Sequence, residues 1–156
     1  MKLLKSTLKS EQRDLDDNNV QLDTIGDISA LPSDVQDQLN KTKQFLSKNS
    51  GLKLVLALNY GGRQEIIQAF EKLAKEGHKQ FNEKLVSEKL YTSKWGDPDL
   101  VIRTSGEFRV SNFLLWQIAY AEMVITPTLW PDFRRKQFYE AIIEYQSRDR
   151  RFGAVR

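Results

Sequence analysis

The chain has 156 residues, of which 40% are hydrophobic and 29% charged, a composition typical of a globular protein rather than a disordered one. It contains no cysteine and a single histidine, His78, which excludes disulfides, thiolate zinc sites, iron–sulfur clusters and cysteine nucleophiles. No apolar run is long enough for a membrane span or for the core of a secretory signal, so we expect a cytoplasmic protein.

The net charge of +3 is distributed unevenly along the chain. Residues 134–156 contain seven Lys/Arg and three acidic residues, a net charge of +4, which leaves −1 for residues 1–133. A basic nucleic-acid module would spread its positive charge over an exposed face. The clustering at one end favours an anionic ligand instead, and we expect no nucleic acid partner.

Hydrophobic periodicity and turn residues predict alternating helices and strands. In chain order, the predicted elements are a helix over 1–18, a strand over 20–25, a helix that begins at Ser33 and is closed by Gly51, a strand over 52–58, helices over 64–76 and 82–91, a strand over 100–103, a helix over 112–121, a strand over 123–126 and a helix over 133–150. The nearly continuous apolar run 52–58 predicts a buried parallel strand. The alternation predicts an α/β fold with a mostly parallel central sheet flanked by helices, in a single domain over residues 1–156.

Polar, glycine-containing segments follow three of the predicted strands, at the edge of the sheet where ligands bind in open α/β folds. Gly26-Asp27 is more typical of a simple turn than of a binding loop. Asn59-Tyr60-Gly61-Gly62-Arg63 is equally compatible with a tight turn and with a loop whose backbone N–H groups contact an anion. Composition alone does not separate these two alternatives.

The segment 103–111 gives the strongest local signal. Arg103 and Arg109 flank a flexible loop, and Ser111 lies where the predicted helix 112–121 begins. Guanidinium groups match phosphate oxygens bidentately, and a helix N-terminus adds free N–H groups, so this arrangement predicts a diphosphate site. The alternative is that an arginine pairs with Glu107 and that the serine only caps a helix.

Other polar and aromatic residues favour structural roles. Asp14, Asp16 and Asp17 lack the glycine and glutamate of a calcium loop and fit an exposed helix end. His78 fits the surface, and the basic run 134–136 fits a solvated face. The aromatic residues at helical spacing fit a core or an interface better than a base-stacking platform: Phe113, Trp116 and Tyr120.

Several sequence blocks resemble the cis-prenyltransferases, and bacterial undecaprenyl diphosphate synthases most closely. These blocks are 99–107, Arg109, 111–117, 120–122, 129–133 and 150–153, preceded by Asn59-Tyr60-Gly61-Gly62-Arg63 and Ile25-Gly26-Asp27. The family condenses isopentenyl diphosphate with an allylic diphosphate and forms a new cis double bond. The resemblance implies the α/β cis-prenyltransferase fold rather than the all-α fold of trans-prenyl synthases.

The resemblance also implies roles for individual residues. Arg103, Arg109 and Ser111, with Val110 between the last two, would bind the isopentenyl diphosphate group, and Glu122 would take part in a Mg²⁺ site. Arg151 and Gly153 would reach the substrate site of the partner subunit in a homodimer. Phe108 stands where some relatives carry a histidine, so no metal ligand is expected from that side chain.

One departure from the family pattern is large. The Asp-Gly-Asn-Gly-Arg loop, which supplies the catalytic aspartate and cradles the allylic diphosphate, does not occur in the 156 residues, and neither does the following block with its asparagine. We therefore expect the C-terminal two-thirds of the family fold, truncated at its N-terminus, with no catalytic residue of its own and little activity. The alternative is a non-catalytic accessory subunit of a heteromeric cis-prenyltransferase, although such subunits generally lose the Arg103–Ser111 block. Transient association with a membrane surface is expected only through the lipid product.

Overall fold

The structure, a computed structural model, describes residues 1–149 of the chain. The chain divides into two compact units, Met1–Glu65 and Ile66–Arg156, and each has its own buried hydrophobic cluster. Each unit is described by itself, and the single domain predicted over residues 1–156 stays a prediction.

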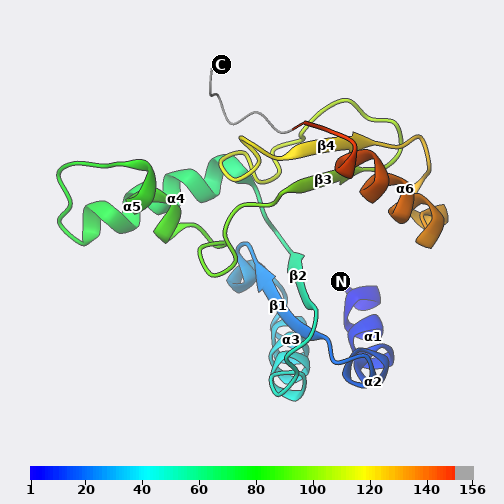
Figure 1. The fold of residues 1–156 in the computed structure, drawn as a ribbon. Coiled ribbons are helices and arrows are strands. Elements are labelled where there is room, and N and C mark those ends of the chain that lie inside the picture. Colours follow the sequence, from blue (N-terminus) through cyan, green and yellow to red (C-terminus); the bar gives the residue numbers. More distant parts are fainter. Residues whose placement is uncertain (150–156) are drawn as a thin grey trace. The chain divides into compact units, whose positions relative to one another are not determined.

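The first unit packs helices against a small parallel sheet (Figure 1). Its elements are α1 (Lys2–Ser10), α2 (Gln12–Asp17), β1 (Gln21–Ile25), a 3₁₀ turn (Ile28–Ala30), α3 (Ser33–Phe45) and β2 (Lys53–Ala57). The predicted helix over 1–18 is thus divided at Glu11, but its apolar stripe is confirmed. Leu8 is buried in the core with Leu39, and Leu4 packs against the same cluster.

Strand β2 runs parallel to β1, as predicted, and Gln21 pairs with Lys53 at the start of the register. The prediction that residues 52–58 are buried throughout is wrong, because Leu52 is 69% and Leu54 36% exposed. Leu56 and Leu58, by contrast, pack against the core cluster. Strand β2 is therefore only partly buried, at Val55 and Leu56, and its other residues are exposed.

The second unit contains a helical pair and a second parallel sheet. Its elements are α4 (Gly62–Lys75), which begins in the first unit, α5 (Glu83–Lys89), β3 (Leu100–Arg103), β4 (Glu122–Ile125), a 3₁₀ turn (Trp130–Asp132) and α6 (Arg135–Gln146). Leu73 of α4 and Val86 of α5 are buried in one cluster, whereas Ile67 and Phe70 of α4 are exposed although their spacing is helical. Helix α6 packs along β4 (Figure 1).

The helix predicted over residues 112–121 is wrong. This segment forms a series of turns, because Ser111, Asn112 and Leu114 have positive φ angles of 52°, 61° and 45°, which a right-handed helix does not allow. Of the aromatic residues at helical spacing, only Trp116 packs against the core, whereas Phe113 and Tyr120 are exposed. Trp116 donates its indole N–H to Ser87 Oγ at 3.0 Å, and Gln117 is buried.

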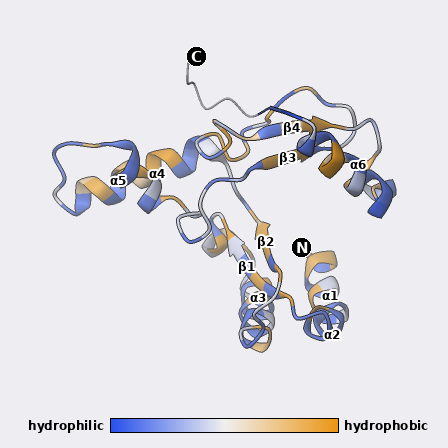
Figure 2. Cartoon of the chain, viewed as in Figure 1, coloured by the Kyte–Doolittle hydropathy of each residue, from blue (hydrophilic) through white to orange (hydrophobic). Residues whose placement is uncertain are grey.

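Hydrophobic residues are concentrated in the strands and along one side of the helices (Figure 2). Among the described residues, no helix is long and apolar enough to cross a membrane.

Candidate functional site

The carboxyl ends of β3 and β4 are joined by backbone hydrogen bonds that continue beyond the strands. In the parallel register Arg103 lies opposite Ile125. The N–H of Thr126 donates to the carbonyl of Arg103 at 2.9 Å, and the N–H groups of Ser105 and Gly106 donate to the carbonyls of Thr128 and Thr126, both at 2.9 Å. We call the segment from Arg103 to Arg109 the arginine loop. Its start is therefore fixed to the segment that follows β4.

The other end of this loop is closed by a tight turn. The N–H of Phe113 donates to the carbonyl of Val110 at 3.2 Å across Ser111 and Asn112, the two consecutive residues with positive φ. This is the arrangement of a type I′ turn. The turn explains why Ser111 does not begin a helix, and the predicted contribution of a helix N-terminus to anion binding is accordingly wrong.

A cavity of about 490 Å³ opens between the loop and the sheet. Its polar side is lined by Arg103, Thr104, Ser105, Glu107 and Arg109, and its apolar wall is formed by Val101, Ile102, Val110, Phe113, Ile118 and Met123. The structure thus brings Arg103, Arg109 and Val110 to one cavity. A pocket with convergent cations and an apolar wall suits a small ligand that has an anionic head and a hydrocarbon body.

The two arginines have different partners in this cavity. Arg103 donates through Nη2 to Ser111 Oγ at 3.5 Å, so Ser111 lies beside the site although it is absent from the cavity wall. Arg109 Nη1 lies 2.5 Å from the Glu107 carboxylate oxygen Oε2. The ion pair between Arg109 and Glu107, which the sequence analysis gave as the alternative to diphosphate binding, is therefore present. It lies in the cavity wall beside the proposed diphosphate site.

Glu122 begins β4 and forms an ion pair with Arg148, two residues after the end of α6. Arg148 Nη1 donates to Glu122 Oε2 at 2.7 Å, and Arg148 Nη2 bonds to Glu144 one helical turn earlier. These hydrogen bonds, first with Glu122 and then with Glu144, raise the pKa of Arg148 above its ordinary value. The pairing joins α6 to the edge of the sheet.

The described residues form no ready-made protein site for a magnesium ion. Mg²⁺ is bound through carboxylate oxygens and water, with one or more carboxylates free to face it. Among residues 1–149 no three His, Cys, Asp or Glu side chains gather in a way that could bind a metal ion. The carboxylate of Glu122, which the resemblance implies as a ligand, is instead hydrogen-bonded to Arg148. We therefore assign no step of any reaction to a metal ion.

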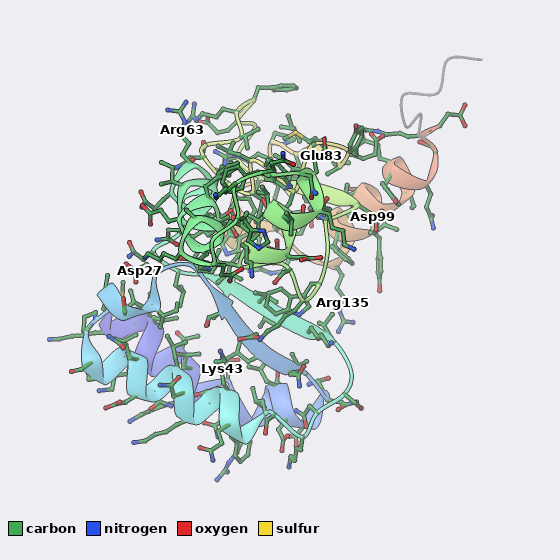
Figure 3. The ribbon with its side chains drawn as sticks, turned by 90° about the vertical axis from the view of Figure 1, so that its left-hand side faces the viewer. Asp27, Lys43, Arg63, Glu83, Asp99 and Arg135 are labelled. Carbon is green, nitrogen blue, oxygen red and sulfur yellow. The ribbon has the colours of Figure 1, made fainter. Side chains whose placement is uncertain are left out.

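The two polar segments of the first unit meet at the ends of β1 and β2. The N–H of Asp27 donates to the carbonyl of Asn59 at 3.2 Å, and Asn59 Nδ2 donates to the carbonyl of Asp27, also at 3.2 Å. Figure 3 labels Asp27 at this end of the unit and Lys43 on α3, which forms an ion pair with Asp23 of β1. The prediction that these segments come together at the strand ends is confirmed, and whether they bind an anion stays a prediction.

The remaining predictions from the sequence have clear outcomes where the structure describes them. Asp14 and Asp17 are exposed as expected, whereas Asp16 is half-buried and pairs with Lys48; His78 is a surface residue near Glu76. Arg151 and Gly153 lie outside the described residues.

Two contacts around the site were not predicted. Arg148 meets Glu122 from 26 positions away, and no spacing rule links them. The apolar wall, however, had a usable signal, because two short apolar strands were predicted there; in the observed parallel register Val101 lies opposite Met123.

The chain matches proteins of one family along nearly its whole length. The sequence model described as "Putative undecaprenyl diphosphate synthase" matches residues 1–153. The isoprenyl transferase of Clostridium tetani is 48% identical over 161 aligned positions, which cover 99% of this chain and 63% of that protein. The ditrans,polycis-undecaprenyl-diphosphate synthase of Shewanella oneidensis, named as (2E,6E)-farnesyl-diphosphate specific, is 45% identical over 98% of this chain and 58% of that protein.

A solved structure agrees with these matches. The lavandulyl diphosphate synthase from Lavandula x intermedia, in complex with dimethylallyl diphosphate, superposes with a TM-score of 0.93 and 35% identity over 99% of this chain and 70% of that chain. The α/β fold with parallel strand pairing predicted from the sequence is thereby confirmed. The chain spans about 60% of the length of the two bacterial relatives.

Proposed function

Because the chain belongs to the undecaprenyl diphosphate synthase family of prenyltransferases, we propose that it takes part in condensing isopentenyl diphosphate with an allylic diphosphate to a cis-polyprenyl diphosphate, an undecaprenyl-type lipid carrier. The observation that supports this best is the pair of arginines, Arg103 and Arg109, which line one cavity at the carboxyl end of β3. The names of the relatives agree, since one is specific for farnesyl diphosphate and another is complexed with dimethylallyl diphosphate.

In the proposed complex the diphosphate of isopentenyl diphosphate binds the two guanidinium groups and the hydroxyl of Ser111. Arginine forms bidentate, charge-assisted hydrogen bonds to phosphate oxygens, and two such groups also neutralise most of the ligand's charge. The short isopentenyl chain would then lie against the apolar wall formed by Phe113, Ile118 and Met123. This places the double bond, which is the nucleophile, at a fixed distance from the arginines and away from water.

We further propose that the 156 residues alone support binding but little chain elongation. The reaction requires the allylic carbon–oxygen bond to break, and its departing diphosphate has to be stabilised electrostatically. Arg103, Arg109 and Ser111 serve the nucleophilic substrate in this proposal. The Asp-Gly-Asn-Gly-Arg segment that serves the leaving group in the family does not occur in the 156 residues.

A second copy of the chain is the partner that we propose. The second unit has several large apolar side chains in contact with solvent, among them Phe108, Trp130, Tyr120 and Ile143. Exposed apolar surface of this kind is typical of an interface. The contribution of Arg151 and Gly153 to a partner's site, the magnesium dependence and the cytoplasmic location stay predictions from the sequence.

The proposal is tested by measuring the binding of labelled isopentenyl diphosphate to the purified chain. Arg103→Ala and Arg109→Ala each remove charge-assisted hydrogen bonds, on the order of 1.5–3 kcal/mol, so the dissociation constant should rise by roughly tenfold or more. Arg135→Ala is the matched control, because Arg135 is an exposed arginine at the start of α6 that lies outside the cavity wall.

Equal binding by the wild type and by both site variants would contradict the diphosphate assignment. A chain that binds no isopentenyl diphosphate but raises the activity of another prenyltransferase subunit would support the accessory-subunit alternative. The same chain is also assayed for incorporation of label into extractable polyprenyl product. A rate within about tenfold of that of a full-length relative would contradict the low elongation activity that we propose.

A further inference from the structure

We propose that Glu107 acts as an internal competitor of the diphosphate. Its carboxylate binds Arg109 in the ligand-free site, and it has to leave that guanidinium before a diphosphate oxygen can take its place. The inference rests on the proposed function, and it identifies a residue of this chain that determines the affinity of that site.

The contact geometry supports this exchange. Glu107 Oε2 lies 2.5 Å from Arg109 Nη1, and both side chains line the same cavity as Arg103. A carboxylate and a phosphate present the same kind of oxygen acceptor to the guanidinium fork, so the two cannot use the same N–H groups at once. Glu107 therefore occupies on Arg109 the place that a diphosphate oxygen would need.

The two arginines are not equivalent in this respect. Among the described residues Arg103 forms no ion pair, and its side chain makes a long hydrogen bond to the neutral hydroxyl of Ser111. Its positive charge faces the cavity without a carboxylate beside it. We infer that Arg103 attracts the diphosphate first and that Arg109 becomes available when the Glu107 carboxylate turns away.

The exposure of the pair makes such a movement easy. The side chains of Arg109 and Glu107 are 64% and 37% exposed, and both belong to a loop that lies between the backbone-bonded residues 105–106 and the turn at 110–113. Exposed ion pairs are weak, so the released carboxylate is readily hydrated. The competition should thus lower the affinity of the site by a small factor rather than abolish binding.

The experiment is a calorimetric titration of inorganic pyrophosphate, without added metal, into the purified chain at low ionic strength. Glu107→Gln removes the competing charge and retains the shape of the side chain, and we expect pyrophosphate to bind about two- to fivefold more tightly than to the wild type. Glu140→Gln is the matched control. Glu140 is an exposed glutamate on α6 that faces Lys136, so this variant changes the net charge equally and should bind like the wild type.

A double variant separates competition for Arg109 from simple repulsion between Glu107 and the ligand. In the Arg109→Ala background, Glu107→Gln should give no further gain, because the guanidinium for which it competes is absent. A gain of the same size in both backgrounds, or no gain in the wild-type background, would overturn the inference. Arg103→Ala reports on the proposed function separately: if it leaves pyrophosphate binding unchanged, the diphosphate site itself is wrong.

Circular dichroism of each variant shows whether the fold is retained. Glu107 lies outside every helix and strand and outside both hydrophobic clusters, so Glu107→Gln should retain the unfolding midpoint of the wild type. A changed affinity with an unchanged midpoint cannot be attributed to a structural role of Glu107.

Discussion

Gly26 lies so close to the end of β2 that a single methyl group should destabilise the first unit. A Cβ atom at position 26 would lie 2.1 Å from the carbonyl oxygen of Leu58 and 3.1 Å from Tyr60 Cβ. Real Cβ atoms essentially never come within 3.0 Å of such neighbours, and the closest atom here is backbone, which cannot rotate away. The residue also has φ = +104°, a conformation that L side chains rarely adopt.

The magnitude follows from these two costs. Forcing a methyl group into a packed region costs about 1–3 kcal/mol, and a non-glycine residue at positive φ adds about 1–2 kcal/mol. Gly26→Ala should therefore lower the free energy of unfolding by about 2–5 kcal/mol, a large fraction of the stability of a small protein. Gly77→Ala is the matched control, because Gly77 has φ = +86° but no atom within 4 Å of the added Cβ. It should show only the conformational cost.

Urea denaturation followed by far-ultraviolet circular dichroism measures both variants, and amide hydrogen exchange of β1 and β2 locates the effect in the first unit. The three tryptophans, Trp95, Trp116 and Trp130, all belong to the second unit, so their fluorescence reports on that unit separately. Equal destabilisation by Gly26→Ala and Gly77→Ala would refute the steric argument and show that the backbone at Leu58 yields without cost.

Two further predictions concern charged groups. Glu122→Gln should weaken the connection between β4 and α6 and lower the unfolding midpoint, because Arg148 loses a carboxylate partner. The same variant should leave the magnesium dependence of ligand binding unchanged. A shifted magnesium titration would instead support Glu122 as a metal ligand. Burial raises the pKa of Asp97, so its ionised form destabilises the folded state at neutral pH. This cost disappears at low pH, where the carboxyl is protonated in both the folded and the unfolded state. Asp97→Asn should therefore raise the unfolding midpoint at pH 7 and converge with the wild type below about pH 4; equal midpoints at pH 7 would contradict the assignment.

The strands and most helices could be predicted because they depend on local apolar spacing. Residues 100–103 and 123–126 are short apolar segments next to proline or polar turns, and the structure has β3 and β4 there within one residue. The spacing of Leu8, Leu39 and Leu73 likewise identifies buried positions without knowledge of the tertiary fold. The buried face of a helix depends on neighbours three or four positions away in the sequence, which the local pattern contains.

The turn segment 111–121 could not be predicted in the same way. Its apolar residues have helical spacing, and only the backbone conformations of Ser111, Asn112 and Leu114 exclude a helix. Serine and leucine give no sequence signal for positive φ, in contrast to glycine. The conformation must be imposed by tertiary contacts such as the hydrogen bond from Trp116 to Ser87.

The site was predictable in composition but not in its pairings. Arg103 and Arg109 were expected together because they flank one loop, Val110 was implied by the family resemblance, and all three line one cavity. The sequence did not decide whether Arg109 faces Glu107, since charged residues two positions apart in a loop can point either way. The pairing of Glu122 with Arg148 depends on how α6 packs on β4, which local patterns do not contain.

The way in which the arginine loop is attached has a consequence for how this site can diverge among relatives. Backbone hydrogen bonds fix residues 105–106 to the segment after β4, and the turn at 110–113 fixes the other end of the loop. None of these hydrogen bonds uses a side chain of residues 107–109. Substitutions at these three positions should then alter ligand preference at little cost to folding. Phe108, which is 88% exposed, packs against neither hydrophobic cluster, so a side chain of different chemical character there should cost little stability. Single substitutions at residues 107–109 should therefore be able to change which ligand the site prefers without compensating changes elsewhere in the chain.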